Sequence, residues 1–205
     1  GGERALQACH ETLEKLGLDY VDLMLVHWPG VSKTPLGSPL NAQLRLESWR
    51  VLEELYGAGQ FRAIGVSNYE TQHLQELSMA ATVKPMVNQI ECHPRYQQAA
   101  NRKLCAELGV AVVAYASLGQ GELLKEPAVQ QVAETHGITA SQVLLRWGLE
   151  KGCCVIPKSV DPMRIKDFAA TSLLSSWDLD ERETELLDSL GSNSKKFCWD
   201  PKDVA

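Results

Sequence analysis

The stretch "PMVNQIECHP", residues 85–94, begins as an apolar strand and turns polar before it ends. Val87 and Ile90 suit a buried parallel strand, whereas the amides of Asn88 and Gln89 do not. The proline at the end closes the run, because a ring nitrogen cannot extend a ladder of hydrogen bonds. Two interpretations are open at this point: the strand leaves the core through solvated residues, or its end faces a polar ligand.

Similar apolar runs recur along the chain and alternate with helical patterns. Strands are predicted at about 20–27, 62–68, 86–91, 110–116 and 153–159, and helices at about 1–17, 44–57, 69–78 and 97–108. Thr139 stands in capping-box spacing with Gln142 and predicts another helix start. Shorter helices are expected after Asp161 and after Asp180. Asn68 is predicted to cap the helix at 69–78.

Nearly continuous apolar strands are typical of parallel sheets covered on both faces, so two architectures fit. One is an open doubly wound sheet, and the other is part of an eight-stranded α/β barrel. An open dinucleotide-binding sheet would carry a G-x-G-x-x-G turn after its first strand. The nearest approach, "LGQGEL" at 118–123, lies far down the chain and lacks the third glycine, which favours the barrel.

Polar residues at the strand ends support the barrel, because functional side chains of such barrels follow the carboxyl ends of the strands. Five consecutive predicted strands end in this way, in His27-Trp28, Ser67-Asn68, Asn88-Gln89-Ile90-Glu91, Tyr115-Ala116-Ser117 and Lys158-Ser159. Solvated exits at all five ends would be an unusual coincidence. A shared polar ligand is therefore the favoured interpretation.

The composition describes an ordinary globular chain, with 205 residues, 44% hydrophobic and 22% charged. The formal net charge of −6 argues against a nucleic-acid partner. The six cysteines show no zinc spacing, so no metal site is predicted, and they are expected to be reduced thiols in a cytoplasmic protein. The vicinal pair Cys153-Cys154 is expected in the core. No signal peptide or membrane-length apolar stretch is visible.

At these strand ends the sequence resembles the aldo-keto reductase family. The resemblance rests on "LGLDYVDLMLVHWP" (16–29), "RAIGVSNY" (62–69), "VNQIECHP" (87–94), "VVAYASLGQG" (112–121) and "VIPKSVDPMRI" (155–165). It implies a (β/α)8 barrel that binds NADPH across its C-terminal face. This chain would be a partial barrel covering about strands 4 to 8, as a single domain over residues 1–205.

The resemblance also implies a role for each polar strand end. His27 corresponds to the catalytic histidine that orients and polarises the substrate carbonyl, and Trp28 to a wall of the substrate pocket. The cofactor residues are implied as Ser67, Asn68 and Gln89 for the nicotinamide carboxamide, Tyr115 for stacking on the nicotinamide, Ser117 and Leu118 for the loop covering the pyrophosphate, and Lys158, Ser159 and Arg164 for the adenosine 2′-phosphate.

The residue types suit these roles. Ser, Asn and Gln offer donors and acceptors to a carboxamide, and Tyr offers a flat stacking surface. Lys and Arg suit a phosphate dianion. Asn88 and Glu91 are expected to support neighbouring strand ends. Three positions depart from the family pattern: Ala116 replaces a common serine, and Asp167 and Phe168 replace Glu and Asn at the adenine.

The family's catalytic Asp, Tyr and Lys have no counterparts in the chain, which begins in a helical pattern without Met. We therefore expect a fragment, nearly inactive by itself, that lacks about three barrel strands and exposes an open sheet edge. A substrate carbonyl that accepts a hydride becomes an alkoxide, which a general acid must protonate. His27 alone would be a poor substitute for the family's proton donor, a tyrosine whose pKa is tuned by a lysine.

Three functions follow as hypotheses. The first is an NADPH-dependent oxidoreductase that reduces aldehydes or ketones, acting on a small-molecule carbonyl substrate, with no nucleic-acid or membrane partner, and monomeric when full length. The second is a non-catalytic NADP(H)-binding regulatory or structural protein of the same fold. The third is a truncation product without independent function.

Overall fold

Five strands make up the sheet of the protein in a computed structural model that describes residues 1–169 and 177–205. They are β1 (Met24–Val26), β2 (Ile64–Ser67), β3 (Val87–Glu91), β4 (Ala111–Tyr115) and β5 (Cys153–Val155), in the order β1-β2-β3-β4-β5. The pairs β1–β2, β2–β3 and β4–β5 are parallel. The prediction of an α/β fold with a parallel sheet is confirmed.

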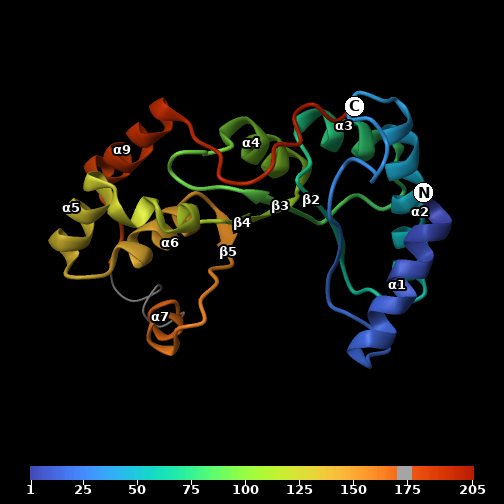
Figure 1. Cartoon of the computed structure of the whole chain (residues 1–205), viewed down its shortest axis with the longest axis horizontal. Helices are drawn as coiled ribbons and strands as arrows, with labels where there is room; N and C mark the ends of the chain where they lie inside the picture. Colours follow the sequence, from blue (N-terminus) through green and yellow to red (C-terminus); the bar gives the residue numbers. More distant parts are fainter. Residues whose placement is uncertain (170–176) are drawn as a thin grey trace. The chain divides into compact units, whose positions relative to one another are not determined.

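Helices alternate with these strands along the chain (Figure 1). The α-helices are α1 (Gly2–Leu16), α2 (Leu40–Gly57), α3 (Thr71–Ala80), α4 (Ala99–Leu108), α5 (Pro127–His136), α6 (Ala140–Glu150), α7 (Pro162–Asp167) and α9 (Glu181–Ser189). Short 3-10 turns are η1 (Gly119–Gly121), η2 (Leu123–Lys125) and η3 (Leu190–Asn193). Parallel strands need such crossovers, because a tight turn cannot return the chain to the starting edge.

The chain divides into two compact units. Unit 1 comprises Gly1–Gln89, Ala100–Ala111 and Asp200–Ala205, and unit 2 comprises Ile90–Ala99 and Val112–Trp199. A single domain over residues 1–205 stays a prediction.

The core of unit 1 forms around α2 and the first strands. Trp49 of α2 is fully buried, and its Nε1 donates to the carbonyl of Val83 at 3.0 Å. Helix α1 packs against α2 (Figure 1), and Cys9 and Leu13, which lie four residues apart on one face of α1, are buried. Leu16, three residues further along, is 56% exposed.

The core of unit 2 forms between α5, α6 and α9. Trp147 of α6 is 1% exposed, and its Nε1 donates to the Asp188 carboxylate of α9 at 2.7 Å. Helix α5 contacts both α6 and α9 (Figure 1). A buried indole requires an acceptor, which Asp188 supplies.

Two predicted helix starts carry the expected capping boxes. The backbone N–H of Gln142 donates to Thr139 Oγ1 at 3.3 Å, and the N–H of Thr139 donates to Gln142 Oε1 at 3.0 Å. Asp180 and Glu183 make the same reciprocal pair at 2.8 and 3.0 Å. These bonds satisfy backbone donors that the first helical turn leaves without partners.

The predicted cap of α3 is wrong. Its N-cap is Glu70, whose N–H donates to Nδ1 of His73 at 3.1 Å. Asn68 lies two residues earlier in a left-handed conformation, with φ 62°. Asparagine tolerates that conformation better than most residues, and the residue turns the chain before the helix begins.

Two other expectations need correction. The last strand ends at Val155, four residues before the predicted end at 159, and Pro157 lacks the N–H that a continued ladder would need. Of the vicinal cysteines expected in the core, Cys153 is buried but Cys154 is exposed. Successive strand side chains point to opposite faces, so two neighbours share one environment only when both faces are covered.

Candidate functional site

The strand ends of unit 1 are tied together by hydrogen bonds. Asn68 Nδ2 donates to the carbonyl of His27 at 3.0 Å and to Ser67 Oγ at 3.1 Å. Ser67 Oγ in turn donates to the carbonyl of Gln89 at 2.7 Å, and the Asn68 N–H donates to the same oxygen at 2.9 Å. The structure thus brings four predicted site residues together: Ser67, at the end of β2, His27 and Asn68, directly after β1 and β2, and Gln89, within β3.

The four residues differ in whether their side chains are already hydrogen-bonded within the protein. The side chains of Ser67 and Asn68 are buried and bonded to backbone carbonyls, so they fix the strand ends. Gln89 is half-buried, and its side-chain amide has no hydrogen-bond partner among the residues that the structure describes. Its amide, like the exposed imidazole of His27, has donor and acceptor capacity left for a ligand.

His27 and Trp28 follow β1 directly. Their ring centroids lie 5.9 Å apart at 39°, with His27 exposed and Trp28 half-buried. The chain is anchored one residue later, because Nη1 of the buried Arg45 donates to the carbonyl of Pro29 at 3.1 Å. Arg45 has no motif around it that would predict this contact from the sequence, because it lies within helix α2.

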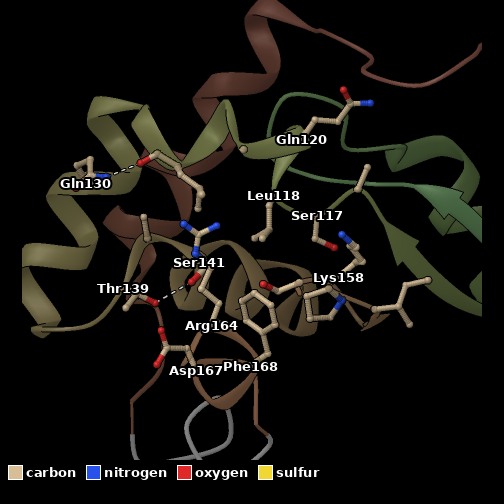
Figure 2. Close-up of a pocket in the computed structure, with 17 residues that line it drawn as sticks. Ser117, Leu118, Gln120, Gln130, Thr139, Ser141, Lys158, Arg164, Asp167 and Phe168 are labelled. Atoms are coloured by element: carbon tan, nitrogen blue, oxygen red, sulfur yellow. Dashed lines mark hydrogen bonds between the residues drawn. The ribbon is translucent and has the colours of Figure 1, made fainter. Parts of the chain in front are cut away.

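Unit 2 holds a cavity of about 650 Å³ (Figure 2). Five predicted cofactor residues line it: Ser117, Leu118, Lys158, Ser159 and Arg164. It is also lined by Ala116, Gln120, Gly121, Leu124, Gln130, Thr139, Ala140, Ser141, Ile156, Pro157, Asp167 and Phe168. Predicted residue Tyr115 precedes the lining segment and is half-buried, and its carbonyl accepts the N–H of Cys92 at 3.3 Å.

The loop after β4 forms one wall of the cavity. Ala116 adopts a left-handed conformation with φ 52°, so the chain turns sharply where the strand ends. Ser117 is buried and its hydroxyl donates to the carbonyl of Ala114 at 3.2 Å. Figure 2 shows Ser117 and Lys158 on the same side of the cavity, across from Thr139 and Ser141.

The start of α7 places Arg164 at the opposite wall. Asp161 Oδ1 accepts the N–H groups of Met163 and Arg164 at 2.8 and 3.4 Å, and Pro162 occupies the first helical position. Pro at that position and Asp before it are the residues that favour a helix start. Figure 2 shows the guanidinium of Arg164 extended into the cavity.

The cavity suits an anion. Lys158 and Arg164 contribute two cations, and the Arg164 side chain is 72% exposed, with its Nε 3.7 Å from Asp161 Oδ2. Helix α6 begins at the cavity with Thr139, Ala140 and Ser141 in the lining, so its positive dipole end adds to the field. The sequence predicted that helix start but gave no sign that it faces the same space as Lys158.

The described ranges 1–169 and 177–205 contain neither a metal-binding cluster nor a helix that could span a membrane. No group of three His, Cys, Asp or Glu side chains there is arranged to hold a metal ion. None of the helices in these ranges has the length and apolar character that crossing a membrane requires.

Comparisons with known proteins converge on one family. The sequence profile described as "Aldo/keto reductase family" matches residues 2–191. The glyoxal reductase of Bacillus subtilis (strain 168) is 40% identical over 195 residues, which are 95% of this chain and 66% of that protein. The chain therefore spans about two thirds of the length of this curated relative.

Solved structures agree with the sequence matches. An aldo-keto reductase enzyme from a Medee basin deep-sea metagenome library superposes with a TM-score of 0.85 at 34% identity, covering 97% of this chain and 69% of that one. A mutant of Gox0644 in complex with NADPH gives a TM-score of 0.84 at 32% identity, covering 98% of this chain and 70% of that one.

Proposed function

The chain belongs to the aldo/keto reductase family, and from that premise we propose that it binds NADPH and serves the reduction of aldehydes or ketones to alcohols. The single observation that carries the proposal is the cavity of unit 2, where Lys158 and Arg164 face the N-terminal end of α6. A solved relative named as a complex with NADPH supports the choice of cofactor.

The lining residues fit a phosphorylated nucleotide. Arg164 presents a fork of donors for the adenosine 2′-phosphate, and Lys158 adds a compact charge. Ser117 and Leu118 lie on the loop proposed to cover the pyrophosphate. Phe168, in the position where the family pattern has Asn, places an aromatic ring in the same lining.

The proposed reaction assigns roles in substrate and nicotinamide binding to residues of unit 1. NADPH, when bound, would supply a hydride to the carbonyl carbon of the substrate, and the resulting alkoxide would take a proton from a general acid to become the alcohol. His27 is proposed to orient the carbonyl oxygen and polarise it, and Trp28 to form a wall against which the substrate packs. Gln89 is proposed to hold the nicotinamide carboxamide, with Ser67 and Asn68 keeping the strand ends rigid.

Calorimetric titration of the chain with NADPH and with NADH tests the proposal. We expect saturable binding of NADPH with a Kd on the order of 1 μM, and weaker binding of NADH, which lacks the 2′-phosphate. Oxidation of NADPH in the presence of glyoxal, a substrate suggested by the name of the Bacillus relative, would then measure turnover, which we expect to be very slow because the chain offers no counterparts of the family's catalytic Asp, Tyr and Lys. A chain that neither releases nor absorbs heat with either nucleotide at several temperatures would contradict the proposal.

A further inference from the structure

The last residue of β3, Glu91, is a buried carboxylate surrounded by donors. It is 1% exposed, and its Oε1 accepts the backbone N–H of Phe197 at 2.6 Å. Oε2 accepts the N–H of Cys198 at 3.1 Å, and Nε2 of the fully buried His93 lies 3.0 Å from Oε1. Three donors on one buried carboxylate make a fixed attachment point for the segment that contains Phe197 and Cys198.

The ionised form of Glu91 is the one that these contacts favour. Burial acts to raise the pKa of Glu91, but the hydrogen bonds from His93, Phe197 and Cys198 outweigh it and lower the pKa. The carboxylate therefore remains an acceptor for both backbone groups around neutral pH. Sequence reasoning expected Glu91 to support a neighbouring strand end, but its backbone partners lie more than a hundred residues away in the chain.

We call residues 195–198 the strap. Its ring at Phe197 packs edge-on against His93, with centroids 5.1 Å apart. The N–H of Lys195 donates to the carbonyl of Arg95 at 3.0 Å, which ties the other end of the strap to the turn after β3. The strap is thus held at both ends by one region of unit 2.

The strap in turn contacts the loop after β4. Gln120 Nε2 donates to the carbonyl of Phe197 at 3.0 Å, and Lys195 pairs with Glu122. Gly119 makes the close approach possible, because a Cβ there would lie 2.7 Å from Cε2 of Phe197. Gly119 also has φ +54°, a conformation that other residues rarely adopt.

Gln120 is the link between the strap and the proposed cofactor site. It belongs to the cavity lining together with Ser117 and Leu118 of the same loop, and Figure 2 shows its side chain turned outward from the cavity. There its amide donates to the carbonyl of Phe197 in the strap. A chain of direct contacts therefore runs from Glu91 through Phe197 to Gln120 and the cavity wall.

We propose that Glu91 is a positioning residue that fixes, through Phe197 and Gln120, the loop covering the pyrophosphate of bound NADPH. This inference rests on the proposed function, because it names what holds one wall of that site. Glu91 touches neither nucleotide nor substrate in this proposal. Its effect is on how long the loop stays closed over the ligand.

The test compares wild type with Glu91→Gln, Gln120→Ala and the double variant. An amide in place of the carboxylate offers one acceptor oxygen instead of two, so one of the strap N–H groups loses its partner. We expect Glu91→Gln to weaken NADPH binding about tenfold, and Gln120→Ala to weaken it by a similar factor. The double variant should bind NADPH about as tightly as whichever single variant has the lower affinity for NADPH, because both changes break the same chain of contacts.

Adenosine 2′-monophosphate separates positioning from general damage. This ligand fills the Lys158–Arg164 end and lacks the pyrophosphate that the loop covers. Its affinity, measured by ligand-observed NMR, should change less than about twofold in Glu91→Gln and Gln120→Ala. Glu107→Gln is the matched control, because it makes the same chemical change in an exposed ion pair with Lys103 on α4. It should leave the affinities for both ligands unchanged.

The outcomes are distinct. Unchanged NADPH affinity in a folded Glu91→Gln, additive losses in the double variant, or parallel loss of both ligands would each overturn the inference while the proposed function stands. Wild type that binds no NADPH would instead refute the proposed function. If Glu91→Gln does not fold, Gln120→Ala alone tests the inference. The inference requires that this variant lowers the affinity for NADPH and leaves the affinity for adenosine 2′-monophosphate unchanged.

Discussion

Replacement of Arg164 by alanine is expected to weaken NADPH binding by about 10- to 100-fold, while NADH binding changes by less than about threefold. The guanidinium extends into the cavity and is largely exposed, so its loss removes phosphate contacts without opening a core (Figure 2). The expected size follows from charge-assisted hydrogen bonds, each of which contributes about 1.5–3 kcal/mol. Calorimetric titration with NADPH and with NADH measures the ratio of their dissociation constants in wild type and in the variant.

Arg164→Lys is the matched control for this experiment. It keeps the positive charge and loses the planar fork, so we expect a loss between those of wild type and Arg164→Ala. Added salt should narrow the preference for NADPH in wild type, because the exposed cation is screened by solvent ions. Equal weakening of NADPH and NADH by Arg164→Ala would contradict the placement of the 2′-phosphate at this residue.

Gly65→Ala is expected to destabilise the protein by about 3 kcal/mol or more, or to prevent folding. Gly65 lies in β2, and an added Cβ would stand 2.6 Å from the carbonyl oxygen of Val87 and 2.8 Å from Cδ2 of Leu25. The nearer atom is backbone of β3, which cannot move away without disturbing the register of the sheet. Urea unfolding, followed by circular dichroism, gives the change in the free energy of unfolding.

Gly57→Ala controls for the loss of glycine itself. Gly57 is the last residue of α2, and a Cβ added there meets no atom within 4 Å. Alanine costs less conformational entropy than glycine in a helix, so we expect a gain of at most about 1 kcal/mol. Comparable destabilisation by both substitutions would show that close packing against Val87 is not the cause.

Most of the secondary structure could be predicted because the local signals agree with the tertiary environment. The strands are apolar runs, and β2 is buried at all four of its positions from Ile64 to Ser67, so both of its faces are covered. The starts of α6 and α9 were marked by residues whose side chains bond to the first turn, Thr139 and Asp180. Such pairings act within four residues, so the sequence alone contains them.

The errors arose where distant groups decide the outcome. A polar residue in a helical pattern is ordinarily placed at the surface, but His73 of α3 is 1% exposed. Its Nδ1 accepts the N–H of Glu70, so Nε2 carries the proton and donates to the carbonyl of Val204 at 2.8 Å. Burial lowers the pKa of His73, which agrees with a neutral ring. A partner 131 residues away leaves no mark in a local pattern.

For the candidate site too, the residues within recognisable motifs could be predicted from the sequence, and the residues that join the site through long-range contacts could not. The resemblance pointed to Lys158 and Arg164, and both line one cavity in the structure. It gave no account of Gln120 or of the N-terminal residues of α6, because their participation depends on how the loop after β4 and α6 come together. The link from Glu91 to Gln120 depends on the fold in the same way.

The two deeply buried indoles give each half of the molecule its own optical probe. Trp49 lies in the core of unit 1 and Trp147 in the core of unit 2, each bonded through Nε1. Indole emission shifts to longer wavelength when the ring meets water. Replacing the other tryptophans by phenylalanine, and then one of these two, leaves a chain whose fluorescence reports the melting of a single half.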